Sequence, residues 1–177
     1  MINNLRILII CIFLSVSSLS YCGQENTFRE SKIGGFDFST KLISNQKLMN
    51  LYGKGCADKN YPYHYRRLYY FPQKEIYAAF DIGTDNLVVG LKLTKEPIIS
   101  KKCNAIKPLK NYETSKKITL GDSKEKVIKA YGSPSIEDVK TNQVILYRYY
   151  VGNEEGSYME IELLNNRVIS IWVTVSE

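Results

Sequence analysis

Two stretches of the chain place apolar residues at helical spacing. In the later stretch, Val127, Ile128 and Tyr131 fall on one side of a helix, with lysines on the other side. The earlier stretch repeats this stripe with Leu48, Met49 and Tyr52. The sequence therefore predicts two short amphipathic helices whose matching tyrosines are 79 residues apart, as the numbers 52 and 131 show.

End signals support both helices. Asp122 and Glu125 have the spacing of a capping box, in which the first side chain accepts a backbone N–H and the second reaches back. Ser44 is the expected cap of the earlier helix. Gly53 and Gly132 suit the positions just beyond the two ends. The later helix should span about three turns.

A tyrosine-rich run and two alternating segments follow each helix. The runs are residues 68–71 and 148–151, and the alternating segments are residues 77–82, 88–93, 157–164 and 168–173. Turn-type residues join the members of each alternating pair, at residues 83–86 and 164–167. The fold class predicted is α+β, with two tandem modules at residues 33–103 and 104–177. In each, a short helix packs on an antiparallel β-meander sheet, and residues 94–117 contain the linker.

Residues 1–22 have the features of a secretory signal peptide. One basic residue, Arg6, precedes an apolar run over residues 7–14 and then small polar residues. This run is too short to span a bilayer. Residues 19–22, Leu-Ser-Tyr-Cys, resemble a bacterial lipobox, which predicts lipidation of Cys22; ordinary cleavage after Ser20 is the alternative. We expect residues 23–32 to form a tether.

Cysteine parity bears on these two processing routes. Cys11 leaves with the signal peptide, and ordinary cleavage then leaves three cysteines in an oxidising compartment. Lipidation of Cys22 removes the odd one, so Cys56 and Cys103 are predicted to form a disulfide. The alternative is a metal site with His64, but it is short of ligands because structural zinc takes four.

Positive charge gathers in the first module. Residues 30–103 hold 12 Lys or Arg against 7 Asp or Glu, whereas residues 104–177 hold 10 of each. Within residues 61–71, aromatic residues alternate with two arginines, a composition that suits stacking on bases or anchoring a protein interface. Export argues against nucleic acid. Contact with anionic lipid or glycan, and simple packing of the tyrosines on the sheet, are the other interpretations.

The polar sides of the predicted strands offer a second candidate surface. It would display an exposed Trp flanked by Tyr, together with charged residues, unless the two modules pack these faces on each other. Together the two surfaces give the predicted partner-binding residues: Tyr65, Arg66, Arg67, Tyr69, Tyr77, Lys92, Tyr158, Glu160 and Trp172.

The sequence contains no recognisable catalytic motif. The chain contains one histidine and lacks nucleophile elbows, HExxH, calcium loops and glycine-rich phosphate loops. The carboxylate pairs, Glu154 with Glu155 and Glu160 with Glu162, are expected in a turn and on an outer strand face, where they are solvated. We therefore expect a protein that is not an enzyme and uses no cofactor and no metal.

The segment Ile-Thr-Leu-Gly-Asp-Ser at residues 118–123, its helix and the Tyr-Gly-Ser-Pro ending at residues 131–134 resemble the module of the SmpA/OmlA (BamE) outer-membrane lipoproteins. In its duplicated form the pattern resembles the β-lactamase-inhibitor-protein fold, in which two tandem helix-plus-sheet modules form one binding surface. The likeness covers about residues 33–177. The first copy departs from it, since Gly55 replaces the proline.

These resemblances imply an exported bacterial protein that binds another protein without chemistry. The first hypothesis is an outer-membrane lipoprotein, anchored through Cys22, that acts as a scaffold or assembly accessory. The second is a secreted or periplasmic inhibitor of a hydrolase. The third is a surface binder of glycan or anionic lipid, whose binding would be sensitive to salt.

Overall fold

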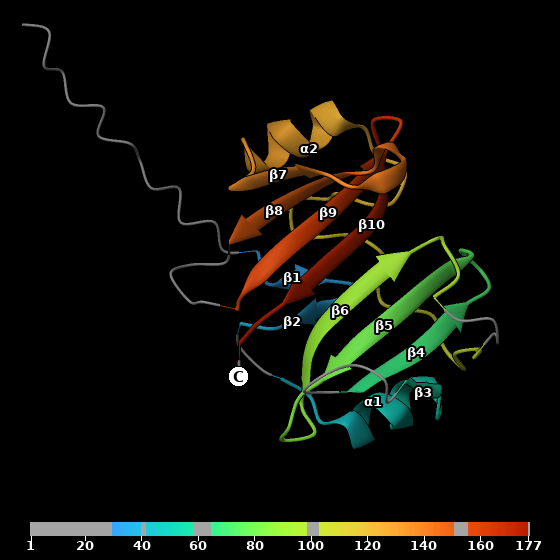
Figure 1. Cartoon of the computed structure of the whole chain (residues 1–177). Coiled ribbons are helices and arrows are strands. Elements are labelled where there is room, and N and C mark those ends of the chain that lie inside the picture. Colours follow the sequence, from blue (N-terminus) through green and yellow to red (C-terminus); the bar gives the residue numbers. More distant parts are fainter. Residues whose placement is uncertain (1–29, 40–41, 59–64, 99–102, 151–155, 177) are drawn as a thin grey trace, which may run out of the picture.

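The protein has an α+β fold with a mostly antiparallel sheet. The computed structural model describes residues 30–39, 42–58, 65–98, 103–150 and 156–176. These residues form two α-helices, an eight-stranded sheet and a small two-stranded hairpin. Figure 1 shows how they are arranged. The elements are β1 Lys32–Ile33, β2 Phe36–Asp37, α1 Asn45–Tyr52, β3 Cys56–Asp58, β4 Tyr65–Phe71, β5 Ile76–Ile82, β6 Val88–Thr94, α2 Lys124–Tyr131, β7 Ile136–Val139, the 3₁₀ turn Thr141–Gln143, β8 Ile145–Tyr150, β9 Tyr158–Leu164 and β10 Arg167–Thr174.

The large sheet has the strand order β3-β4-β5-β6-β10-β9-β8-β7, and every neighbouring pair is antiparallel. Four strands from the earlier half of the chain thus meet four from the later half at β6 and β10. In this central pair Leu93 lies opposite Ile171 and Lys92 opposite Trp172. The sequence predicts a sheet for each half, and the structure joins them into one, because alternation fixes the face of a residue but not which edge strands pair.

Serine caps the start of both helices. The Ser44 hydroxyl accepts the backbone N–H of Lys47, as predicted, and Ser123 accepts that of Lys126. The prediction that Asp122 caps the second helix is wrong by one residue. Asp122 instead closes the preceding turn, where its carboxylate accepts the backbone N–H of Thr119 at 2.8 Å, so the next residue becomes the cap.

Both helices end where the sequence predicts. Gly53 and Gly132 have φ of 88° and 77° with extended ψ, a conformation that residues with a Cβ rarely adopt. Their backbone N–H groups donate to the carbonyls of Met49 and Ile128, at 2.8 and 2.7 Å. Both glycines therefore satisfy a carbonyl of the last turn while turning the chain away.

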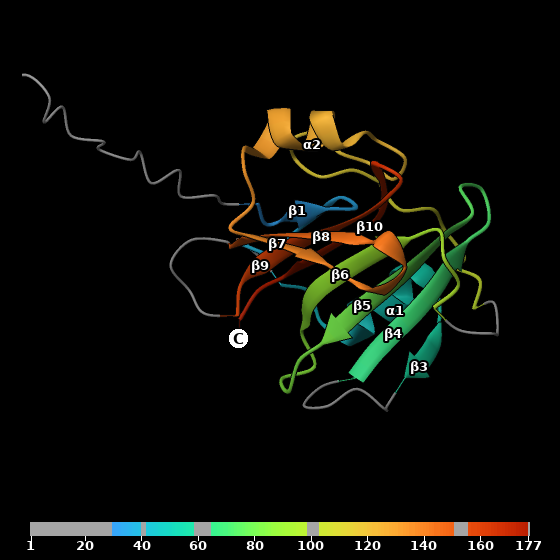
Figure 2. The ribbon, with the colours of Figure 1, turned by 45° about the horizontal axis from the view of Figure 1, so that its top comes forward.

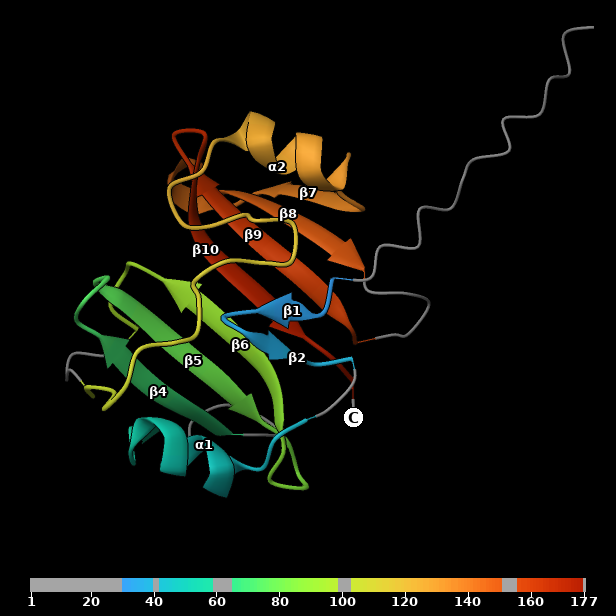
Figure 3. The ribbon, with the colours of Figure 1, turned by 180° about the vertical axis from the view of Figure 1, so that it is seen from behind.

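The hydrophobic core lies between the helices and one face of the sheet. Leu48 and Tyr52 from α1 and Val127 from α2 share this core with the alternating Ile, Leu, Val, Phe and Tyr residues of the central strands. Figure 3 looks onto this side, where the helices, the β1–β2 hairpin and the connection after residue 103 lie over the sheet, and Figure 2 shows α1 behind β4 and β5. We call this the helix-covered face.

The start of the described chain is part of the packed fold. Glu30 is 2% exposed, and its carboxylate accepts hydrogen bonds from the hydroxyls of Ser115 and Tyr131, at 2.6 and 2.7 Å, and from the backbone N–H of Lys32. Residues 30–32, which the sequence assigns to a tether, are therefore fastened to α2. The predicted signal peptide, Cys22 and His64 lie outside the described residues.

Candidate functional site: the helix-free face of the sheet

Figure 1 looks onto the opposite face of the sheet, over which no described helix or strand lies. We call it the helix-free face. Strand register places polar and aromatic side chains in rows across it. One row runs Arg66, Asp81, Gly90, Thr174, Tyr158 and Tyr150, and the next runs Leu68, Ala79, Lys92, Trp172, Glu160 and Arg148. Strands from both halves of the chain thus contribute to one surface.

A buried carboxylate organises the middle of this face. Asp81 on β5 is 1% exposed and forms an ion pair with Arg66 on β4, with 2.6 Å between Oδ1 and Nε. Its other oxygen accepts the indole N–H of Trp172 on β10 at 2.7 Å. Gly90 on β6 leaves room between them, since a Cβ there would come within 2.8 Å of Asp81 Oδ2. Both oxygens of a buried carboxylate are satisfied in this way.

Aromatic contacts continue from Trp172 into the later strands. The Arg66 guanidinium carbon lies 5.1 Å from the centre of the Trp172 ring, and Tyr158 meets that ring edge-on at 5.3 Å between centroids. The Arg148 guanidinium carbon in turn lies 4.9 Å from the centre of the Tyr158 ring. We call Arg66, Trp172, Tyr158 and Arg148 the arginine–aromatic array, in which cations flank two rings.

A second carboxylate holds the other end of the array. Glu160 on β9 accepts two N–H groups of Arg148, at 2.9 Å from Nε and 2.5 Å from the terminal nitrogen. Hydrogen bonding to Glu160 raises the pKa of Arg148. Both arginines are therefore held by carboxylates of the same chain, and charge-assisted bonds of this kind are among the stronger ones in proteins.

A charge cluster flanks the array. Glu162 lies between Lys92 and Lys140, with nitrogen-to-oxygen distances of 3.1 and 2.8 Å. Burial acts to raise the pKa of Glu162, but the two lysines outweigh it and lower the pKa. The strands β6 and β9 are thus linked across β10 by Lys92 and Glu162.

The structure divides the predicted partner-binding residues between the two faces of the sheet. The helix-free face carries Arg66, Tyr77, Lys92, Tyr158, Glu160 and Trp172. The helix-covered face carries Tyr65, Arg67 and Tyr69. Residues 65–71 therefore do not form one surface, because they are a strand whose side chains alternate between the two faces.

The three residues on the helix-covered face fasten α1 to the sheet. The Tyr65 hydroxyl accepts a hydrogen bond from the side-chain N–H of Asn45. Arg67 donates hydrogen bonds to the side-chain oxygen of Asn45 and to the backbone carbonyl of Lys54. The Tyr69 hydroxyl donates to the backbone carbonyl of Gly53. Burial raises the pKa of Tyr69 to about 12. Tyr69 is 1% exposed, so its side chain does not lie on the surface.

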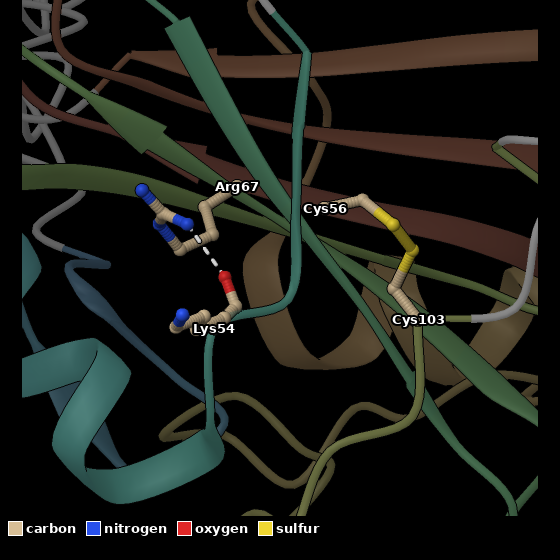
Figure 4. The surroundings of a disulfide bond; sticks show 4 residues. All are labelled: Lys54, Cys56, Arg67 and Cys103. Atoms are coloured by element: carbon tan, nitrogen blue, oxygen red, sulfur yellow. Dashed lines mark hydrogen bonds between the residues drawn. A yellow bond between two sulfur atoms is a disulfide. The ribbon is translucent and has the colours of Figure 1, made fainter.

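The predicted disulfide is present. Cys56 at the start of β3 is bonded to Cys103, and their Cα atoms are 5.7 Å apart. Figure 4 shows it close to the contact between Arg67 and the Lys54 carbonyl. The bond ties the three-residue edge strand β3 to the connection that leaves the first half of the chain.

Two residues of the site were absent from the sequence-based list. Arg148 holds one end of the array, and Asp81 sits beneath it. The signal was available, since Asp81 is a lone carboxylate in an otherwise apolar strand and a buried charge requires a partner. The contact of Asp81 with Trp172 depends on the pairing of β6 with β10, and the sequence does not show that these two strands pair.

The cations of the array are arginines, and each is paired with a carboxylate outside the array, Arg66 with Asp81 and Arg148 with Glu160. Within the described parts of the chain, no group of three or more His, Cys, Asp or Glu side chains could hold a metal ion. Helices long and apolar enough to cross a membrane are likewise absent from the described residues.

A separate polar cavity of about 290 Å³ lies on the other side of the molecule. The β1–β2 hairpin and the segment around residues 110–117 line it, with side chains of both signs: Lys32, Asp37, Lys110, Glu113 and Lys117. Ion pairs within its wall join Lys32 to Asp37 and Lys117 to Glu113. The cavity shares no residue with the array.

No family model and no curated protein matches this chain. Three solved structures are similar to it. A DUF4309 family protein (YjgB) from Bacillus subtilis is 12% identical with a TM-score of 0.49, over 75% of this chain and 78% of that one. A cysteine-rich secretory protein from Staphylococcus aureus is 12% identical with a TM-score of 0.48, over 84% of this chain. An extracellular protein containing a SCP domain from Bacillus anthracis is 10% identical with a TM-score of 0.46, over 90% of this chain.

This chain spans about half the length of the latter two proteins, 46% and 49%. With TM-scores below 0.5, these likenesses do not place it in any of the three families.

Proposed function

We propose that this protein is a non-enzymatic binding module that recognises another protein through the helix-free face of its sheet. The observation that carries the proposal is the arginine–aromatic array, with both arginines held by buried or nearly buried carboxylates. Trp, Tyr and Arg are the side chains most often found as energetic anchors of protein interfaces. Here the three types occur together on four strands, β4, β10, β9 and β8, of one sheet.

Preorganisation supports a binding role for these side chains. A flexible Arg or Trp loses rotamer freedom when a partner immobilises it, at about 0.5–1.5 kcal/mol for each side chain. Asp81 fixes Arg66 and Trp172 in the free protein, and Glu160 fixes Arg148. The entropy cost of ordering them is met during folding, so more of the contact energy remains for binding.

We further propose that the chain consists of two tandem copies of one α+β module. Both helices have eight residues, a serine cap and a terminal glycine of positive φ, and they begin 79 residues apart at Asn45 and Lys124. Each helix precedes four strands, and the strand order is mirrored about the β6–β10 pair. This organisation favours the resemblance to the BamE-like module and, in duplicate, to the β-lactamase-inhibitor-protein fold.

The proposed location is the bacterial cell envelope. The signal-peptide pattern of residues 1–22 supports export, and the disulfide suits an oxidising compartment. Lipidation of Cys22 would anchor the protein to the outer membrane and favours a role as scaffold or assembly accessory. A freely secreted chain would favour an inhibitor of a hydrolase instead.

Site-specific photo-crosslinking in the native envelope tests the binding face. A photoreactive phenylalanine analogue replaces Tyr150, which is 42% exposed on the helix-free face, or Gln46, which is exposed on α1. We expect one defined adduct from the first position and none from the second. A Trp172→Ala change should abolish that adduct, whereas Ile106→Ala, at an exposed apolar side chain elsewhere, should leave it intact.

The identity of the adduct decides between the two roles. A component of outer-membrane assembly supports the accessory, and a soluble hydrolase whose activity falls on binding supports the inhibitor. Adducts of equal yield from both positions, or an adduct indifferent to Trp172→Ala, would contradict the proposed face.

A further inference from the structure

One edge of the large sheet is exposed along its whole length. β7 is an outer strand, and all four of its residues are exposed, including the apolar Ile136 at 37% and Val139 at 68%. The opposite edge, β3, has three residues and is tied down by the disulfide at Cys56. Unpaired edge strands are templates for pairing with another chain. The two edges thus differ in how far they are protected.

The hydrogen-bond phase of β7 shows which backbone groups point outward. The Lys140 N–H donates to the Val144 carbonyl at 2.8 Å, which continues the β7–β8 ladder. Because bonding directions alternate in a regular antiparallel pair, Asp138 turns its backbone groups toward β8. The alternation does not extend to the start of the strand, where the Ser135 N–H donates to the Arg148 carbonyl at 2.9 Å. Glu137 and Val139 therefore turn theirs away from the sheet, where β7 has no neighbouring strand in the described chain.

Charge indicates what kind of strand could pair there. Glu137 and Asp138 are adjacent; Glu137 lies 3.8 Å from Lys124, and no described cation forms an ion pair with Asp138. Two β7 strands from different copies could pair antiparallel through their outward backbone groups in two registers that align most of both strands. One sets Asp138 against its own copy and the other sets Glu137 against its own copy, and opposed like charges are destabilising. A second copy of this chain is thus disfavoured.

We propose that the β7 edge binds an extended segment of another protein by antiparallel strand addition. The segment carries basic residues opposite Glu137 and Asp138 and apolar residues opposite Ile136 and Val139. Backbone hydrogen bonds to Glu137 and Val139 supply affinity and the cross-strand pairs supply selectivity. This site is separate from the arginine–aromatic array, and the proposal does not depend on the function proposed for the array.

A peptide titration tests this site on the disulfide-bonded chain lacking residues 1–22. The probe is the blocked peptide Thr-Val-Lys-Arg-Val-Thr, and the control replaces Lys-Arg with Glu-Glu. We expect NMR shifts of the Glu137 and Val139 amides and slower hydrogen exchange of both N–H groups. The acidic peptide should bind about tenfold more weakly, since two cross-strand pairs change from attractive to repulsive.

Two variants separate strand addition from other modes of binding. Val139→Pro removes an outward N–H without breaking the β7–β8 ladder, whereas Val139→Thr keeps that N–H. We expect the proline variant to lose the peptide and the threonine variant to keep it, with thermal unfolding confirming that both are folded. Equal binding of both peptides, binding that survives Val139→Pro, or no shift at Glu137 and Val139 would overturn the proposal. Concentration-dependent shifts without peptide would point to a second copy and would also overturn it.

Discussion

Trp172 donates its indole N–H to Asp81 at 2.7 Å, although the strands that carry them, β10 and β5, are separated by β6. The hydrogen bond passes over Gly90, the one position in β6 without a side chain. It links residues 91 positions apart and joins the earlier half of the sheet to the later half. The orientation of Trp172, the only tryptophan of the chain, thus depends on the absence of a Cβ at residue 90.

Gly90→Ala should therefore disturb the array. The new Cβ would lie 2.8 Å from Asp81 Oδ2 and 2.9 Å from the Val173 carbonyl, and overpacking of this kind costs about 1–3 kcal/mol. We expect reduced stability in urea together with an altered Trp172 fluorescence spectrum. Gly132→Ala is the control, because it has open space but a positive φ. It should lower stability while leaving the fluorescence of the folded protein unchanged.

The Arg66–Asp81 pair should show strong coupling. Arg66→Met leaves a carboxylate that is 1% exposed without its cation, and loss of one partner of a buried pair costs about 3–5 kcal/mol. Asp81→Leu removes the carboxylate that accepts from Arg66 and from the Trp172 N–H. We expect the double variant to be markedly more stable than the sum of the two losses predicts, as a urea double-mutant cycle would measure. Simple additivity would show that the pair contributes little.

Loss of the disulfide should reduce stability without changing the array. Cys56 and Cys103 are 47 residues apart, and the chain-entropy model gives about 4 kcal/mol for a loop of that size. We expect Cys56→Ser with Cys103→Ser to lower the free energy of unfolding by about 2–4 kcal/mol. Trp172 fluorescence of the folded state should be unchanged. Resistance of both wild-type cysteines to alkylation before reduction provides the control.

Asp37 should contribute to acid sensitivity. Burial acts to raise its pKa, but hydrogen bonds from Ser39 and the contact with Lys32 lower it from 3.8 to about 2. A group whose pKa is lower in the folded state stabilises the protein above its unfolded value and loses that contribution as the pH falls. The relevant window is therefore between pH 4 and pH 2. We expect unfolding midpoints to fall less steeply across it in Asp37→Asn, and an identical slope would contradict this.

Much of the local structure could be predicted from the sequence. Ser44, Gly53 and Gly132 mark helix boundaries where the structure has them, and the alternating segments became β5, β6, β9 and β10. These features depend on residues close together in the chain. The error in placing the cap of the second helix at Asp122 is also local. Asp122 and Ser123 are both good capping residues, but the Asp122 carboxylate is already bonded to the Thr119 N–H, so Ser123 is the cap.

Long-range pairing set the limit of prediction. The β6–β10 contact creates one sheet, and with it the array, yet each of these strands shows only its own alternation. The β1–β2 hairpin was missed although Gly34 and Gly35, between Ile33 and Phe36, have the composition of a two-residue turn. Strands of two residues carry too little periodicity to be recognised before their packing partners are known.

The central position of β10 also constrains the order of events after synthesis. Arg66 and Asp81 emerge about a hundred residues before Trp172, so β6, with Val88, Val89, Leu91 and Leu93, remains an open edge until β10 arrives. During that interval the chain carries an aggregation-prone strand and no complete array. A nascent or proteolytically shortened chain lacking β10 would therefore lack Trp172 and leave β6 unpaired on that side.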